Sequence, residues 1–188
     1  MIDRAAEGPR DGFVRLATID DGQAIGEVHA ASWQSGFGHM LDLEFLERAA
    51  AGRRNGWQYA IAHLLEQSNL LLVAGRDERV LAFSQSGLPD EGGADREIFA
   101  FYCHPLAWGT GLSDALMRET CDVRSVAASR TVLWTPEQAH RAQHFYERCG
   151  FARTGRTRNE ALSDWQRTPA HQEVQAVEYA RDLNRGRP

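Results

Sequence analysis

The chain has 188 residues and a formal net charge of -5, with 43% apolar and 25% charged side chains. This length suits one domain, and the acidic balance argues against a general nucleic-acid binder, which needs a basic face. The longest apolar runs are too short to span a membrane, and the N-terminus lacks the apolar segment of a signal peptide. We therefore expect a cytoplasmic protein whose partners include neither a membrane nor a nucleic acid.

Residues 1–12 are expected to form a loose tail, so that a single domain would cover 13–188. In the first half of that domain, apolar residues recur with strand spacing, then with helical spacing, and then in continuous runs. In chain order this predicts a strand at 13–19, a helix capped by Asp20 or Asp21, helices at about 43–51 and 57–67, and hairpin strands at 69–75 and 80–86.

The second half alternates strands with helices. A strand–helix–strand unit there should supply one parallel pair within a mostly antiparallel sheet. Gly150 follows a helical pattern at the position of a C-cap glycine. In chain order the pattern predicts a strand from 97 to 103, a helix to about 124, a strand at 131–135, a helix at 137–149, a strand from 151 and a last strand at 174–183.

A glycine-rich turn, WGTGLS at 108–113, joins the strand that ends at Cys103 to the next helix. The first N–H groups of a helix have no partner within the helix, and glycines let the backbone approach a phosphate closely. The turn therefore predicts a site for a phosphorylated ligand. A P-loop needs a lysine, and the chain has none. A dinucleotide fingerprint would place Asp114 at its third glycine, where it would crowd the helix and repel a diphosphate.

The same turn resembles the acyl-coenzyme A pyrophosphate loop of the GNAT acetyltransferase superfamily, whose pattern is Gln/Arg-x-x-Gly-x-Gly/Ala. Trp108 takes the Gln/Arg position, Gly111 matches the central glycine, and Ser113 keeps the last position small. A second block, 140–151, resembles the family's Asn-x-x-Ala-x-x-Phe-Tyr-x-x-x-Gly-Phe, except that the asparagine falls on Ala139. The residues of this block in register are Ala142, Phe145, Tyr146, Gly150 and Phe151.

The resemblance implies an α+β GNAT fold, with a mixed, mostly antiparallel sheet of about six to seven strands flanked by helices. It also implies acetyl-coenzyme A as co-substrate and no metal. The pantetheine arm would pair along the strand that ends at Cys103, where a backbone N–H would serve the thioester oxygen. The residues expected to hold the cofactor are Phe101, Tyr102, Cys103, Gly109, Thr110, Gly111, Leu112 and Ser113.

Two catalytic residues follow from the resemblance. Tyr146 is the expected general acid, because its ordinary pKa of about 10 keeps the hydroxyl protonated; the alternative is a core tyrosine bonded to a backbone carbonyl. Glu97 is the expected general base, acting through water, because some family members carry a glutamate eleven residues before the Trp108 position. The alternative for Glu97 is a strand-end carboxylate in contact with Arg96 or solvent.

Other candidates have simpler explanations. Cys103 could in principle be a nucleophile, but a buried strand cysteine explains it better, and the three cysteines are too scattered for a disulfide framework. His140 and His144 lack the intervening glutamate of a zinc motif. Acidic residues of the loop at 88–96 could attract a cationic amine or simply be solvated. Trp33 is a candidate for the acceptor pocket, with an ordinary core position as the alternative.

The sequence thus predicts an enzyme that transfers acetyl from acetyl-coenzyme A to a primary amine by direct attack. The acceptor stays open between a small molecule, such as a polyamine, an antibiotic or an amino acid, and a peptide amine. The oligomeric state is also open, a homodimer included. The competing class is a non-catalytic acyl-coenzyme A binder of the same fold, which would bind the cofactor without releasing thiol.

Overall fold

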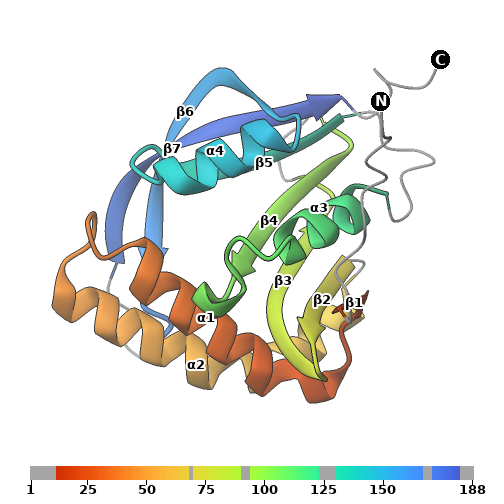
Figure 1. Cartoon of the computed structure of the whole chain (residues 1–188). Helices are drawn as coiled ribbons and strands as arrows, with labels where there is room; N and C mark the ends of the chain where they lie inside the picture. Colours follow the sequence, from red (N-terminus) through yellow and green to blue (C-terminus); the bar gives the residue numbers. More distant parts are fainter. Residues whose placement is uncertain (1–11, 68–69, 90–93, 123–129, 167–170, 183–188) are drawn as a thin grey trace.

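The described part of the chain forms one mixed sheet flanked by helices (Figure 1). The computed structural model describes residues 12–67, 70–89, 94–122, 130–166 and 171–182. The strands are β1 (Gly12–Leu16), β2 (Leu70–Arg76), β3 (Arg79–Gly87), β4 (Arg96–Cys103), β5 (Arg130–Pro136), β6 (Ala152–Ser163) and β7 (His171–Asp182). The helices are η1 (Ile19–Asp21), α1 (Gly22–Gly36), α2 (Leu43–Glu66), η2 (Pro105–Ala107), α3 (Leu112–Asp122) and α4 (His140–Arg148).

The seven strands follow the order β1-β2-β3-β4-β5-β7-β6. Among the strands described, β4 and β5 are the one parallel pair, and all other neighbours are antiparallel. This confirms the predicted α+β class with its mostly antiparallel sheet. The parallel pair is the one predicted around the glycine-rich turn, because a helical crossover returns the chain in the same direction.

Helices cover both faces of the first half of the sheet. Successive side chains of a strand point to opposite faces. Leu71 and Val73 of β2 therefore pack under α1 and α2, whereas Leu72 and Ala74 pack against α3. Figure 1 shows α1 and α2 lying side by side below the sheet. The sheet is thus dry on both faces here, which accounts for the continuous apolar run of β2.

The predicted break between two helices at 43–51 and 57–67 is wrong, because α2 runs without interruption. Glycine has low helix propensity, so the glycines at 52 and 56 favour a break locally. Packing overrides that preference. A Cβ at Gly52 would lie 2.1 Å from the carbonyl oxygen of Asp164, and one at Gly56 would lie 3.1 Å from the Trp165 ring. Both glycines let the segment after β6 approach the helix.

The helix predicted at 137–149 is shorter, since residues 137–139 form a turn and α4 begins at His140. Its end is as predicted, with Gly150 at φ 85° and its N–H bonded to the Glu147 carbonyl. The predicted tail lies outside the described residues except for Gly12, which begins β1. No helix in the described ranges is long and apolar enough to cross a bilayer. We propose that 13–188 is one domain, since the described strands share one sheet.

Candidate active site

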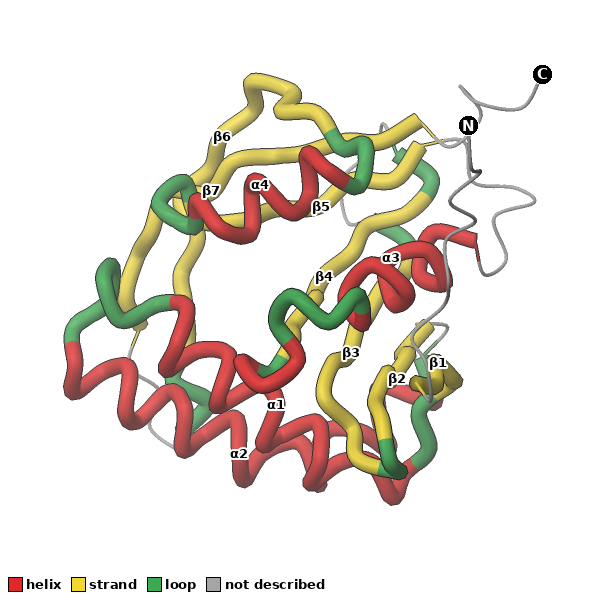
Figure 2. The backbone as a smooth tube through the Cα atoms, viewed as in Figure 1, coloured by secondary structure: helices red, strands yellow, loops and turns green. Residues whose placement is uncertain are grey.

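A cavity of about 970 Å³ opens in the middle of the sheet, a volume suited to a small-molecule ligand. It lies where β4 and β5 separate. The two strands pair only at Arg96–Thr131, Glu97–Val132 and Ile98–Leu133, and they then diverge, as Figure 2 shows. The rest of β4, Phe99–Cys103, therefore has an unpaired edge on this side. The α1–α2 loop, the loop after β4, the end of β5 and α4 complete the lining.

The backbone of Cys103 lies on this unpaired edge. His104 N–H donates to Leu81 of β3, and hydrogen-bonding positions alternate along an antiparallel pair. The N–H and C=O of Cys103 therefore point away from β3, toward the cavity. The carbonyl accepts from Trp108 Nε1 (3.0 Å), and Ser32 Oγ lies 3.1 Å from it, although the single Ser32 proton is shared with the nearer Val28 carbonyl (2.7 Å). The N–H stays available to a ligand.

The turn after β4 forms a cradle of backbone donors at the N-terminus of α3. Gly109 and Gly111 have φ of 75° and 82°, which a residue with a side chain adopts only with strain. A Cβ at either glycine would point into open space. Within the described residues, five N–H groups of this cradle donate no hydrogen bond: those of Gly109, Gly111, Leu112, Ser113 and Asp114. Unpaired donors at a helix N-terminus are an anion site.

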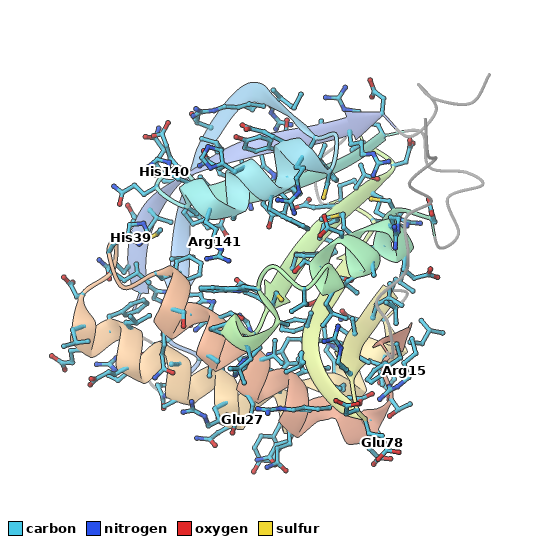
Figure 3. All side chains as sticks on the ribbon, in the orientation of Figure 1. Arg15, Glu27, His39, Glu78, His140 and Arg141 are labelled. Atoms are coloured by element: carbon cyan, nitrogen blue, oxygen red, sulfur yellow. The ribbon has the colours of Figure 1, made fainter. Side chains whose placement is uncertain are left out.

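Asp114 would repel an anion at this position, but a cation neutralises it. Arg148 Nη2 of α4 lies 3.1 Å from Asp114 Oδ1. A second arginine of α4, Arg141, places its guanidinium 3.6 Å from the centre of the Trp108 ring. Figure 3 shows Arg141 reaching from α4 into the opening toward the loop after β4. The two arginines thus extend from one helix toward the two ends of the cradle.

Tyr146 lies on the same helix and lines the cavity with a ring that is 7% exposed. Its ring packs edge-on against Phe101 of β4 and Phe145 of α4. Burial raises the pKa of the Tyr146 hydroxyl far above its usual value, so the group stays protonated. In the described parts of the chain the hydroxyl has no hydrogen-bond partner, unlike that of Tyr179, which bonds Glu147 Oε1 at 3.1 Å.

The structure brings most of the predicted site residues to this cavity. The predicted residues that line it are Phe101, Tyr102, Cys103, Gly109, Gly111, Ser113 and Tyr146. Leu112 packs its side chain in the core and offers its N–H alone. Thr110 turns its hydroxyl to the Ala107 carbonyl (2.8 Å), so it braces the turn. Burial raises the pKa of the Cys103 thiol, which keeps it neutral and a poor nucleophile.

Glu97 and Trp33 do not line the cavity. Glu97 is 9% exposed and lies where β4 pairs with both β3 and β5, before β4 and β5 separate. Trp33 is 1% exposed and stacks under the Arg53 guanidinium, 3.2 Å from its ring centre. The predicted base is therefore not in contact with the cavity, and the predicted pocket tryptophan is a core residue of the wall behind it.

That wall contains a buried histidine. His29 Nδ1 accepts from Trp57 Nε1 (2.9 Å), and Arg53 Nε directs its N–H at the other ring nitrogen (3.2 Å). A neutral imidazole has one ring nitrogen with a lone pair that can accept a hydrogen bond. If His29 took up a second proton, neither Trp57 nor Arg53 would have an acceptor on the ring. Burial, and then the Arg53 charge, lower the pKa of His29 well below its ordinary value. The ring stays neutral under Tyr102, 4.2 Å between ring centres.

Sequence reasoning missed three residues of the site: Ser32, Arg141 and Arg148. Arg141 and Arg148 are seven residues apart, which places them on one face of α4 and could have been noticed. Ser32 reaches Cys103 from α1, far away in the sequence, and no local pattern indicates it. No group of three or more His, Cys, Asp or Glu in the described ranges is placed to hold a metal.

The residues present fit a coenzyme A thioester. The open glycines would admit a diphosphate where any Cβ would intrude, and the unpaired N–H groups would bind its oxygens. The unpaired edge of β4 would take an extended amide chain as an added strand. The aromatic lining at Phe101 and Phe145 would cover that chain from the α4 side.

The family model described as "Acetyltransferase (GNAT) family" matches residues 37–151, more than half of the chain. Among curated proteins, no sequence matches significantly. Many solved structures do match in fold. PaiA N-acetyltransferase from Thermoplasma acidophilum, in complex with coenzyme A, has a TM-score of 0.71 at 15% identity, over 92% of this chain and 99% of its own.

Two further structures show the same likeness. A GCN5-related N-acetyltransferase from Rhodopseudomonas palustris has a TM-score of 0.70 at 15% identity, over 94% of this chain and 98% of its own. The acetyltransferase yncA from Salmonella typhimurium, described as putative and solved with its cofactor acetyl-CoA, has a TM-score of 0.62 at 17% identity, over 95% and 98%. At such identities the likeness establishes the shared fold.

Proposed function

Because this chain belongs to the GNAT acetyltransferase family, we propose that it transfers the acetyl group of acetyl-coenzyme A to the nitrogen of a primary amine. One observation carries the proposal: the split between β4 and β5 opens directly beside a cradle of unpaired N–H groups. A thioester in the split and its diphosphate in the cradle would use both features at once.

The chain supplies two functions before any bond changes. The cradle holds the diphosphate, and the edge of β4 fixes the position of the thioester. The Cys103 N–H is the donor for the thioester oxygen, because it points away from β3 on the unpaired edge of β4 and Cys103 lines the cavity. A backbone N–H fixed in advance stabilises the negative charge that develops on this oxygen and needs no reorganisation.

Acetyl transfer then forms a C–N bond and breaks the C–S bond. The amine nitrogen must be neutral to attack the thioester carbon, and it loses a proton to water at the cavity mouth. The departing sulfur takes up a proton, and Tyr146 is its donor, since this residue lines the cavity and burial keeps its hydroxyl protonated. The phenolate that remains regains a proton from solvent, which restores the residue for the next turnover. Glu97 plays no direct part in this scheme, because it lies outside the cavity lining.

The test offers purified protein acetyl-coenzyme A with a panel of primary amines and measures free thiol. Release that depends on both substrates, with acetylated amine found by mass spectrometry, is the expected result. Binding without release for every amine would favour the non-catalytic acyl-coenzyme A binder. That class stays in contention because Asp114, the one carboxylate residue among the described residues that line the cavity, is paired with Arg148. No binding of coenzyme A by calorimetry would overturn both functions.

A further inference from the structure

The phosphate cradle has no cation of its own. Residues 108–113 contain no basic side chain, and the charged residue that follows, Asp114, is negative. The helix dipole supplies only about half a positive charge, and Arg148 is committed to Asp114. A diphosphate that entered this cradle would keep most of its charge without compensation. In the turn at 108–113, the first position, from which a basic side chain could reach the ligand, is occupied by Trp108.

Arg141 brings a cation to this place from the opposite wall of the cavity. Its guanidinium lies over the Trp108 ring at 3.6 Å, next to Gly109, and both residues line the cavity. In the described part of the chain it forms no ion pair with a carboxylate. A stacked guanidinium keeps its in-plane N–H groups free for an anion.

Trp108 is held in turn, so the arginine has a fixed platform. The indole N–H donates to the Cys103 carbonyl at 3.0 Å, which ties the ring to the end of β4. A cation–π contact with a fixed ring restricts the long arginine side chain before a ligand arrives. Arg141 and the cradle are therefore preorganised beside one another, although they come from different elements of the fold.

We propose that Arg141 is the cation for the diphosphate of the acyl donor, presented from α4 on a Trp108 platform in place of a basic residue in the loop. This rests on the proposed function, because it assumes that coenzyme A occupies the cradle. The ligand chemistry is a diphosphate ester. The guanidinium would pair with its oxygens while the N–H groups of the cradle bind them from the α3 side.

The test is calorimetry of coenzyme A and 3′-dephospho-coenzyme A binding to wild type, Arg141→Gln, Arg141→Lys and, as a matched control, Arg54→Gln. Arg54 pairs with Glu27 on the surface, far from the cavity. We expect Arg141→Gln to weaken both ligands about tenfold and to reduce the salt dependence of binding. Arg141→Lys should lose less affinity than Arg141→Gln, because it keeps the charge but loses the stacked, planar guanidinium, and the control should match wild type.

Three results would count against this inference while leaving the proposed function intact. The first is unchanged binding in Arg141→Gln. The second is a loss confined to coenzyme A and absent for its 3′-dephospho form, since the arginine would then serve the 3′-phosphate. A loss of equal size in Arg141→Lys would also count against it, because positioning of Trp108 rather than charge would be responsible. A wild-type protein that binds neither ligand would instead refute the proposed function.

Discussion

The two ends of β4 have the same strand geometry and opposite roles. At the closed end, Glu97 and Ile98 pair with both β3 and β5, and Glu97 is buried between them. At the open end, Ala100–Cys103 pair with β3 alone and present an edge to the cavity. The change coincides with a bulge, because Ser86 pairs with Ile98 and Gln85 with Ala100, which leaves Phe99 as the extra residue. A bulge bends a strand and increases its twist, so it helps β4 to diverge from β5.

The largest expected effect concerns the open end of β4, where Tyr146 lines the cavity. Tyr146→Phe should lower kcat about 100-fold, because the departing sulfur loses its proton donor. The Kd of acetyl-coenzyme A should stay within about twofold, since the ring still packs on Phe101. Stopped-flow thiol release and calorimetry measure the two quantities.

Tyr179→Phe is the matched control for that variant. It removes a hydroxyl from the same hydrophobic cluster, but this hydroxyl bonds Glu147 rather than facing the cavity. The control should lose some stability and keep its kcat. Equal rates in Tyr146→Phe and wild type would show that Tyr146 only packs.

The next effect concerns the cradle at the mouth of the open end. Gly111→Ala should weaken acetyl-coenzyme A binding more than about tenfold, because the added Cβ enters the space of the diphosphate. Gly155→Ala is the control, since Gly155 in β6 has a similar φ of 89° and equally open surroundings outside the cavity. Both changes should cost about 1–2 kcal/mol of stability from backbone strain. Similar ligand affinity in the two variants would contradict the cradle.

The third prediction concerns the pH dependence of stability. It depends on the buried wall behind Tyr102, which contains His29. His29 stays neutral in the folded protein, whereas an unfolded chain takes up a proton on this ring below about pH 6.5. The stability is therefore full above that pH and should fall as the pH drops, by up to about 1.4 kcal/mol per pH unit. Urea unfolding between pH 7 and 5 measures the slope, which should flatten in His29→Gln. An unchanged slope in that variant would assign the effect to other groups.

The smallest effect is expected at the closed end. Glu97→Gln should leave the pH–rate profile within about twofold of wild type at every pH, because the carboxylate lies outside the cavity lining. A profile that loses its acidic limb, the fall in rate at low pH where a base becomes protonated, would restore Glu97 as a base acting through water. It would also show that the closed end takes part in the chemistry.

Local features of the site were predictable, and features that depend on packing were not. The turn at 108–113 is contiguous, so its glycines and helix start indicate an anion site by themselves. Tyr146 was found through a block of adjacent residues. Ser32 and Arg141 contact Cys103 and Trp108 from other elements. The spacing of Arg141 and Arg148 indicates a shared helix face, but no sequence pattern indicates what that face, or Ser32, contacts.

The same limit explains the errors in the fold. Glycine propensity predicted a break in α2 that close packing against Asp164 overrides. The role of Glu97 stays a prediction: it came from the distance along the chain to Trp108, whereas the structure places Glu97 where β4 still pairs with β5. That pairing ends beside the bulge at Phe99, and residue spacing does not reveal where it ends.

The unpaired edge of β4 also bears on solubility. Exposed strand edges at the rim of a sheet invite pairing with other copies and thereby aggregation. Here the unpaired edge lies in the interior of the sheet, with β5 as the next strand. Residues of α4 line the cavity beside this edge, and the Trp108 indole bonds the Cys103 carbonyl at its end. A single narrow chain can enter such a slot, whereas the broad sheet of a second molecule cannot. A ligand strand could therefore pair with this edge while the sheets of other copies are kept from it.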